Sequence, residues 1–124
     1  TNGMSEYKRP KILQGTTRKI KCGCGNVYIT VNRGKEGITE LFITLGHTGQ
    51  CGASQMEAIG RCVSIGLQYD ISPDVYVKQL KGIRCPCPIM GDGDEVLSCS
   101  DAIAKVLEQE TQNEKLTSNT TRKP

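Results

Sequence analysis

The spacing of the apolar residues changes near residue 50, and this change constrains the fold more than any other feature of the sequence. Before that point apolar side chains alternate with polar ones, and after it they recur every three or four positions. Alternation is typical of a strand with one buried face, and the later spacing is typical of a helix. The sequence therefore predicts an α+β fold, in which a three-stranded antiparallel sheet is followed by about three helices packed on it.

Three alternating segments predict the strands. Their apolar positions are Ile20 and Cys22 in the first segment, Val27, Ile29 and Val31 in the second, and the run 38–45 in the third. The connections 23–26 and 32–37 are rich in Gly and Asn, which favour tight turns. Short turns between neighbouring segments predict that the strands pair in sequence order.

The helical spacing predicts one main core helix after residue 50. The apolar positions of this helix are Ala53, Met56, Ile59, Val63 and Leu67. Because Cys62 lies within the same segment, we expect it to pack in the core.

Capping residues predict two further helices. Ser72 and Pro73 suit the start of a helix that reaches about Leu80 and ends at Gly82. Ser98 with Asp101 resembles a capping box for a last helix, which has a face of apolar residues. These are Ala102, Ile103, Val106 and Leu107.

Composition along the chain predicts three parts. Residues 1–15 read as an N-terminal arm, 16–110 as the folded domain and 111–124 as a disordered polar tail. Residues 1–3 are excluded from the fold, because Met4 resembles a natural start. A start at Met4 and a long polar tail favour a free-standing protein rather than a fragment.

Hydropathy and charge bear on the surroundings of the protein. No stretch has the roughly 18 consecutive apolar residues of a membrane helix, and no signal peptide is visible, so we expect a cytoplasmic protein without a membrane partner. The net charge is only +3, and aromatic residues make up 4% of the chain. Nucleic-acid binding is therefore not expected, because it needs a basic surface with aromatic side chains that stack on bases.

Cysteines are the main candidate functional residues. The chain has seven, and an odd number in a reducing compartment argues against a disulfide framework. Cys24, Cys51, Cys85 and Cys99 lie at the ends of predicted elements, where thiolates can collect around zinc. Two alternatives remain open. The cysteines are small buried apolar residues, or a pair such as 22/24 or 85/87 carries out thiol redox chemistry.

A second candidate site is the glycine-rich stretch before the core helix. Backbone N–H groups of Thr48, Gly49, Gln50 and Gly52 could hold an anion or a nucleotide phosphate at the helix start. The order of a phosphate-binding P-loop is absent, so a tight strand-to-helix turn is the alternative. His47, the one histidine, has no visible catalytic partners and is interpreted as a surface loop residue.

Four ordered blocks of sequence carry a family resemblance. The blocks are residues 23–32, 49–53 with 56–61, 79–86 and 97–104. Together they resemble the TSCPD domain, which is found near the C-terminus of cobalamin-dependent, class II, ribonucleotide reductases and in stand-alone small proteins. The resemblance runs from about Arg9 to Leu107.

The resemblance implies that the recurrent cysteines of the family are Cys24, Cys51, Cys85 and Cys99, the same four that position alone selects. Two features depart from the family. Ser100 stands where the family name has Pro, and no cysteine follows Cys99. The C-terminal cysteine pair that re-reduces full-length reductases is therefore missing, and a chain of 124 residues holds neither the radical-bearing barrel nor a cobalamin site.

The resemblance implies a function without catalysis. We expect an accessory or regulatory domain, zinc-stabilised and linked to deoxyribonucleotide synthesis, whereas the related full-length proteins are ribonucleoside-diphosphate reductases. Its partner would be a ribonucleotide reductase or a nucleotide ligand, and a homo-oligomer is compatible with the sequence. The alternatives are a small protein that binds nucleotides or sequesters cyclic nucleotides, and a thiol redox protein.

Overall fold

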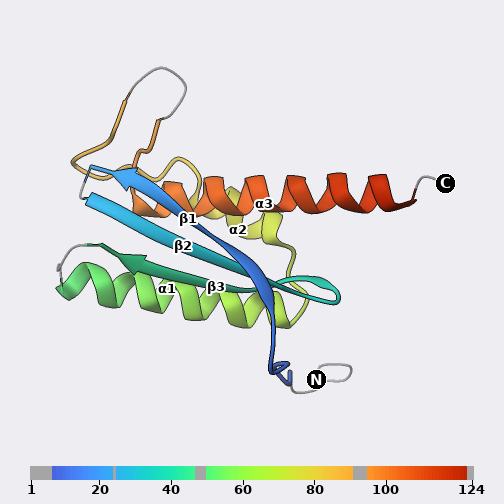
Figure 1. The fold of residues 1–124 in the computed structure, drawn as a ribbon. Helices are drawn as coiled ribbons and strands as arrows, with labels where there is room; N and C mark the ends of the chain where they lie inside the picture. Colours follow the sequence, from blue (N-terminus) through green and yellow to red (C-terminus); the bar gives the residue numbers. More distant parts are fainter. Residues whose placement is uncertain (1–6, 24, 47–49, 91–94, 123–124) are drawn as a thin grey trace.

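Three strands form one antiparallel sheet in the order β1–β2–β3, as predicted (Figure 1). They are β1 (Gln14–Cys22), β2 (Gly25–Gly34) and β3 (Gly37–Leu45). The computed structural model describes residues 7–23, 25–46, 50–90 and 95–122, without the side chains of residues 50 and 116–122. Gly25 and Gly37 have positive φ angles of 124° and 117°, a conformation that glycine adopts without strain where each new strand begins.

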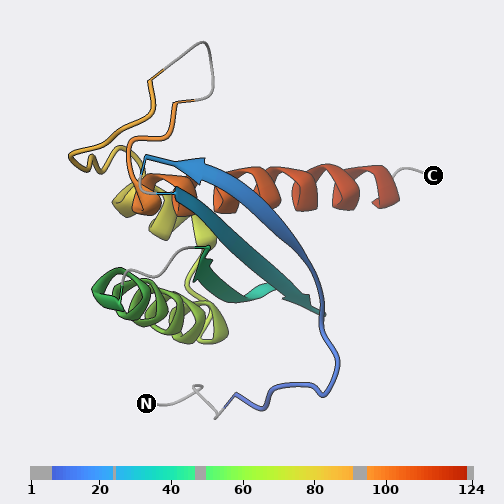
Figure 2. The same ribbon diagram turned by 60° about the vertical axis from the view of Figure 1, so that its left-hand side comes forward.

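The two faces of the sheet have different surroundings. One face buries the alternating apolar residues Val27, Ile29 and Val31 of β2 with Leu41 and Ile43 of β3. The helices pack on this face (Figure 1, Figure 2). The opposite face, called the open face below, carries Lys19 and Lys21 of β1, Tyr28 and Thr30 of β2, and Phe42 and Thr44 of β3.

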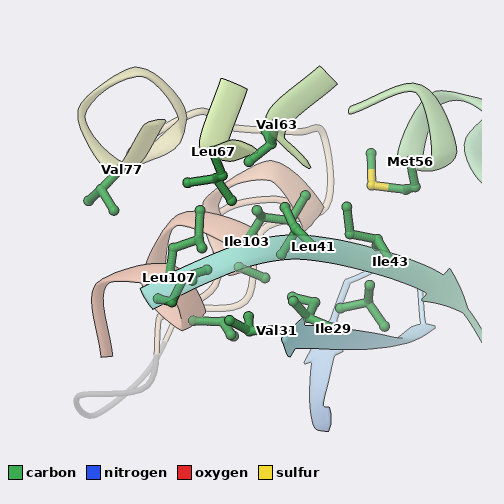
Figure 3. Close-up of a cluster of buried hydrophobic side chains, with 14 of the residues drawn as sticks. Ile29, Val31, Leu41, Ile43, Met56, Val63, Leu67, Val77, Ile103 and Leu107 are labelled. Atoms are coloured by element: carbon green, nitrogen blue, oxygen red, sulfur yellow. The ribbon is translucent and has the colours of Figure 1, made fainter. Parts of the chain in front are cut away.

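Helix α1 (Gln50–Gln68) packs along β3, and its core face is largely the predicted one. Met56, Val63 and Leu67 are buried against the sheet, as Figure 3 shows. Ile59 is half-buried and Ala53 is exposed. The prediction that Cys62 packs in the core is wrong, because it is exposed. One residue from Val63, it is turned by about 100° around the helix axis and lies away from the core.

Helix α1 also covers part of the outer edge of β3. The Ser64 hydroxyl accepts a hydrogen bond from the Leu41 N–H (2.9 Å) and donates one to the Leu41 carbonyl (3.1 Å). The Gln68 amide donates to the Thr39 carbonyl. Gly60 permits this approach, since a Cβ there would lie 3.0 Å from the Leu41 carbonyl oxygen. The helix thus takes the place of a fourth strand at this part of the edge.

Helix α2 (Pro73–Leu80) begins and ends as predicted. Ser72 is the N-cap and accepts a hydrogen bond from the Asp74 N–H, and Pro73 occupies the first turn. The C-cap is Lys81, and Gly82 follows it with a φ of 89°. The helix packs mainly on α3.

Helix α3 (Cys99–Arg122) is longer than predicted. Ser98 caps it as expected, accepting a hydrogen bond from the Asp101 N–H (2.9 Å). The prediction of a disordered tail from residue 111 onward is corrected, because the helix continues past this residue and Glu110 and Thr111 are both buried. Arginines of the sheet hold this polar part of the helix, and those contacts cannot be read from local composition.

The N-terminal arm is shorter than expected. Strand β1 begins at Gln14, inside the range assigned to the arm, and residues 7–13 form no helix or strand. Arg9 fixes this segment to the sheet through Glu40, with 2.5 Å between Nε and Oε2. None of the helices in the described ranges is both long and apolar enough to cross a membrane.

Candidate functional site

Three cysteine-bearing segments meet at one end of the sheet. They are the connection between β1 and β2, the segment around Cys85 and Cys87, and the start of α3 (Figure 1). A Cβ on Gly23 would lie 1.6 Å from the Cys87 carbonyl oxygen, so only glycine fits at that position. The Cys85 N–H donates to the Leu97 carbonyl (2.9 Å), two residues before Cys99. We call this region the cysteine end.

The predicted zinc ligands are only partly described. Cys24 lies outside the described residues. Cys51 is exposed in the first turn of α1, and Cys85 and Cys99 are half-buried. Among the residues that the structure describes, no group of three or more His, Cys, Asp or Glu is arranged to hold a metal ion. The four-cysteine site therefore stays a prediction.

Two local features place backbone N–H groups near the sulfur atoms of the cysteine end. The Cys87 N–H donates to the Cys85 Sγ over 3.4 Å. Cys99 is the first residue of α3, where backbone N–H groups have no partner within the helix. The donor set thus has the chemistry that zinc prefers.

Asp101 holds the start of α3 in place. Its carboxylate is 1% exposed and accepts hydrogen bonds from the N–H groups of Gly82 (2.9 Å) and Leu97 (3.0 Å). Burial alone would raise the pKa of this carboxyl, but Lys105 at 2.8 Å and the two N–H donors outweigh it, and the pKa is lowered. The sequence predicted a capping role, whereas the contact with Gly82 also joins the end of α2 to the start of α3.

Sequence reasoning missed Glu110, a buried carboxylate near the opposite end of the sheet. It is 2% exposed and accepts hydrogen bonds from Arg18 (2.7 Å), Thr16 (3.1 Å) and Arg33. Arg33 lies two positions after the buried Val31 on β2, so the alternation of the strand places it on the helix-covered face. Burial raises the pKa of Glu110, but these donors outweigh it, and the pKa is lowered.

Glu40 is a second buried carboxylate at that end. It accepts hydrogen bonds from Arg9 (2.5 Å) and Asn32 (3.0 Å). Burial raises its pKa, whereas the hydrogen bonds from Arg9 and Asn32 lower it further than burial raises it. No signal in the sequence marked either carboxylate, because most of their partners lie far away in the sequence, on other elements or in the N-terminal arm.

The predicted anion loop is described only at its end. His47, Thr48 and Gly49 lie outside the described residues, and Gln50 and Gly52 belong to the first turn of α1. A Cβ on Gly52 would lie 3.2 Å from the Leu45 side chain. Close packing between α1 and β3 is thus one reason for a glycine here, and anion binding stays a prediction.

Comparison with known proteins identifies the family. The model of the TSCPD domain matches residues 5–111, which include all three strands, α1, α2 and the first half of α3. The chain therefore belongs to the TSCPD domain family.

Curated relatives are much longer proteins. A vitamin B12-dependent ribonucleotide reductase of Streptomyces clavuligerus is 27% identical over 79% of this chain and 10% of its own length. Reductases of the same name from Streptomyces coelicolor and Streptantibioticus cattleyicolor are each 31% identical, over 70% and 68% of this chain and 9% and 14% of their own lengths. This chain thus spans about a tenth of the relatives it matches. No solved structure matches it.

Proposed function

We propose that this chain is an accessory or regulatory domain of deoxyribonucleotide synthesis, which acts by binding and does not catalyse a reaction. The observation that supports this most directly is the extent of the match, which is confined to a segment of 9% to 14% of each reductase. The three described carboxylates with lowered pKa values are each occupied by partners within the chain. These carboxylates therefore serve the fold.

Binding to a reductase tests the accessory role. A vitamin B12-dependent ribonucleotide reductase lacking its own segment similar to this chain would be titrated with the full chain. We expect a complex, measured by isothermal titration calorimetry, and a change in reductase turnover. The chain alone should show no reductase activity. Activity of the chain alone, or no complex at micromolar concentrations, would contradict the proposal.

A structural zinc ion, held by Cys24, Cys51, Cys85 and Cys99, forms part of the same proposal. Two observations support it. Three cysteine-bearing segments meet at the cysteine end, and α1, which carries Cys51 in its first turn, begins beside the C-terminal end of β3 (Figure 2). Bound zinc would neutralise the thiolates and tie α1 and α3 to the β1–β2 connection. This use of a metal would stabilise a small domain with few apolar residues.

Elemental analysis of the purified full chain tests the zinc site. We expect close to one zinc per chain, lost in a Cys24→Ser/Cys99→Ser variant and retained in the control Cys62→Ser, whose thiol is exposed. A chelator should lower the melting temperature of the wild type and of the control. Zinc-free protein with a full melting transition would contradict the metal site but leave the accessory role standing.

A further inference from the structure

The open face of the sheet concentrates residue types that the whole sequence contains in small numbers. The chain has four Tyr and one Phe, and two of these five, Tyr28 and Phe42, lie on this one face. Tyr28 pairs with Thr44, two positions from Phe42, which makes the two rings diagonal neighbours on adjacent strands. Such neighbours lie about 7–8 Å apart. Phe42 is 52% exposed although it is a large apolar residue.

The backbone holds the Tyr28 ring in a defined position. A Cβ on Gly46 would lie 3.1 Å from the ring carbon Cε2, so the ring packs over this glycine. The Gly46 N–H in turn donates to the Asn26 carbonyl (2.9 Å), which fixes the glycine to the sheet. A ring placed in advance loses little entropy when a planar ligand stacks on it.

The charge on the open face is positive. Lys19 pairs with Tyr28 across the strands, and Lys21 follows on the same face, both exposed. Within the three strands one carboxylate lies on this side, Glu40, and Arg9 neutralises it. Hydroxyl groups lie beside the two rings on the same face. They belong to Thr17 and Thr30, which share a hydrogen bond of 2.7 Å, and to Thr44.

We propose that the open face binds single-stranded nucleic acid. Bases would stack on Phe42 and Tyr28, and Lys19 and Lys21 would contact the phosphates. Other open sheets use aromatic residues in this way to stack about two or three bases. A flat face of this kind reads unpaired bases and cannot enter the stacked interior of a duplex.

A cavity beside β1 continues this track beyond the lysines. It has a volume of about 520 Å³, and Lys19, Lys21 and Lys105 line it together with Glu95 and with apolar residues of β1, of the segment before α3 and of α3. Lys105 is already paired with Asp101 at 2.8 Å. The strand would leave the sheet along this cavity, with Lys19 and Lys21 as its two phosphate contacts.

Fluorescence anisotropy of the full chain with labelled oligonucleotides tests the proposal. The probes are oligothymidylate and oligouridylate of about ten nucleotides, and a duplex of the same length at the same low salt concentration. We expect both single strands to bind and the duplex to bind at least tenfold more weakly. The logarithm of the binding constant should fall linearly with the logarithm of the salt concentration, with a slope of about −1.4 for two phosphate contacts.

Ring variants test the stacking. Phe42→Ala and Tyr28→Ala should each weaken binding about tenfold, whereas Tyr28→Phe should bind like the wild type. Ile65→Ala is the matched control, because Ile65 is 56% exposed on α1, outside the open face. Circular dichroism melts would show that each variant remains folded.

Lysine variants separate a defined site from general charge attraction. Lys19→Ala/Lys21→Ala should weaken binding and flatten the salt slope toward zero. Lys35→Ala/Lys78→Ala removes the same charge from exposed positions in the β2–β3 turn and α2 and should change little. Equal losses in the two pairs, or equal binding of duplex and single strands, would overturn the proposal.

The oligomeric state distinguishes nucleic-acid binding from the main alternative, in which a second copy of the chain covers the open face. Sedimentation velocity should show that Phe42→Ala leaves the oligomeric state unchanged. A dimer that dissociates in this variant would mean that the open face is buried between copies. That result would overturn nucleic-acid binding there, as would the absence of single-strand binding at low salt.

Discussion

Near the β2–β3 turn, Glu110 and Glu40 join β1, β2, β3, α3 and the N-terminal arm through arginines, whereas at the cysteine end the segments meet through backbone contacts and thiols. The end near the β2–β3 turn, called the carboxylate end below, thus has both of its buried carboxylates paired within the chain. The cysteine end has sulfur atoms whose strongest interactions would come from a metal or an oxidant. Each end has a buried carboxylate with a lowered pKa, Glu110 at one and Asp101 at the other, whereas only the cysteine end should also be sensitive to thiol chemistry.

Removing the Glu110 carboxylate gives the largest expected effect. In Glu110→Ala, Arg18 and Arg33 lose their shared partner while still mostly buried, and we expect a loss of about 3 kcal/mol in the free energy of unfolding. Urea denaturation measures it. Glu108→Ala is the control, because Glu108 pairs with Lys81 at the surface and should contribute less than about 1 kcal/mol. Similar effects of the two variants would remove the distinction between the ends.

Acid should loosen the carboxylate end. The pKa values of Glu110 and Glu40 are lowered in the folded state, so the unfolded chain binds more protons once the pH approaches the usual carboxyl value of 4.5. Their contribution is complete above that value and is lost as the pH falls further. We expect urea midpoints to be constant from about pH 7 to 6 and to fall below about pH 5. The slope should be smaller in Glu110→Gln, and an unchanged slope would contradict this origin.

The N-cap of α3, Ser98, allows a test of stability at the cysteine end. Ser98 is buried, accepts from the Asp101 N–H and donates to the Ile83 carbonyl (2.6 Å). Ser98→Ala should cost about 1–2 kcal/mol, because it removes an N-cap and leaves a carbonyl without its donor. Ser72→Ala, at the exposed cap of α2, should cost less. Thermal melts would compare the two, and an equal or larger effect at Ser72 would contradict the importance of this contact.

The smallest effect is expected at Cys62. This thiol is exposed on α1 and belongs to neither end, so Cys62→Ser should change the free energy of unfolding by less than about 0.5 kcal/mol. The buried Cys22 is the comparison, since Cys22→Ser would replace a small apolar core side chain with a polar one, and we expect a larger effect there. A large effect at Cys62 would show that its side of α1 is covered in solution.

Local pattern was sufficient to predict most of the fold. The three strands, their order and the caps at Ser72 and Ser98 are confirmed, because alternation, turn residues and capping side chains act over a few positions. The prediction for Cys62 was wrong because it did not distinguish the side of the helix that carries Cys62 from the side that carries Val63, one residue away.

Long-range polar contacts could not be predicted. The partners of Glu110 are 77 to 94 positions away in the sequence, so its burial and the continuation of α3 left no local signal. The four-cysteine site stays a prediction, because the distances between the sulfur atoms depend in part on Cys24, which lies outside the described residues. The open face was missed because composition counts aromatic residues without showing that two of them become neighbours.

The separation of Glu110 from its partners also bears on how the chain folds. The two hairpins of the sheet close over short turns, whereas the Glu110 contacts close loops of 77 to 94 residues. Closing long loops has a larger entropic cost, so the hairpins can form first and α3 can dock on them later. Loss of Glu110 should then accelerate unfolding more than it slows refolding, and the carboxylate would determine how long the folded chain survives.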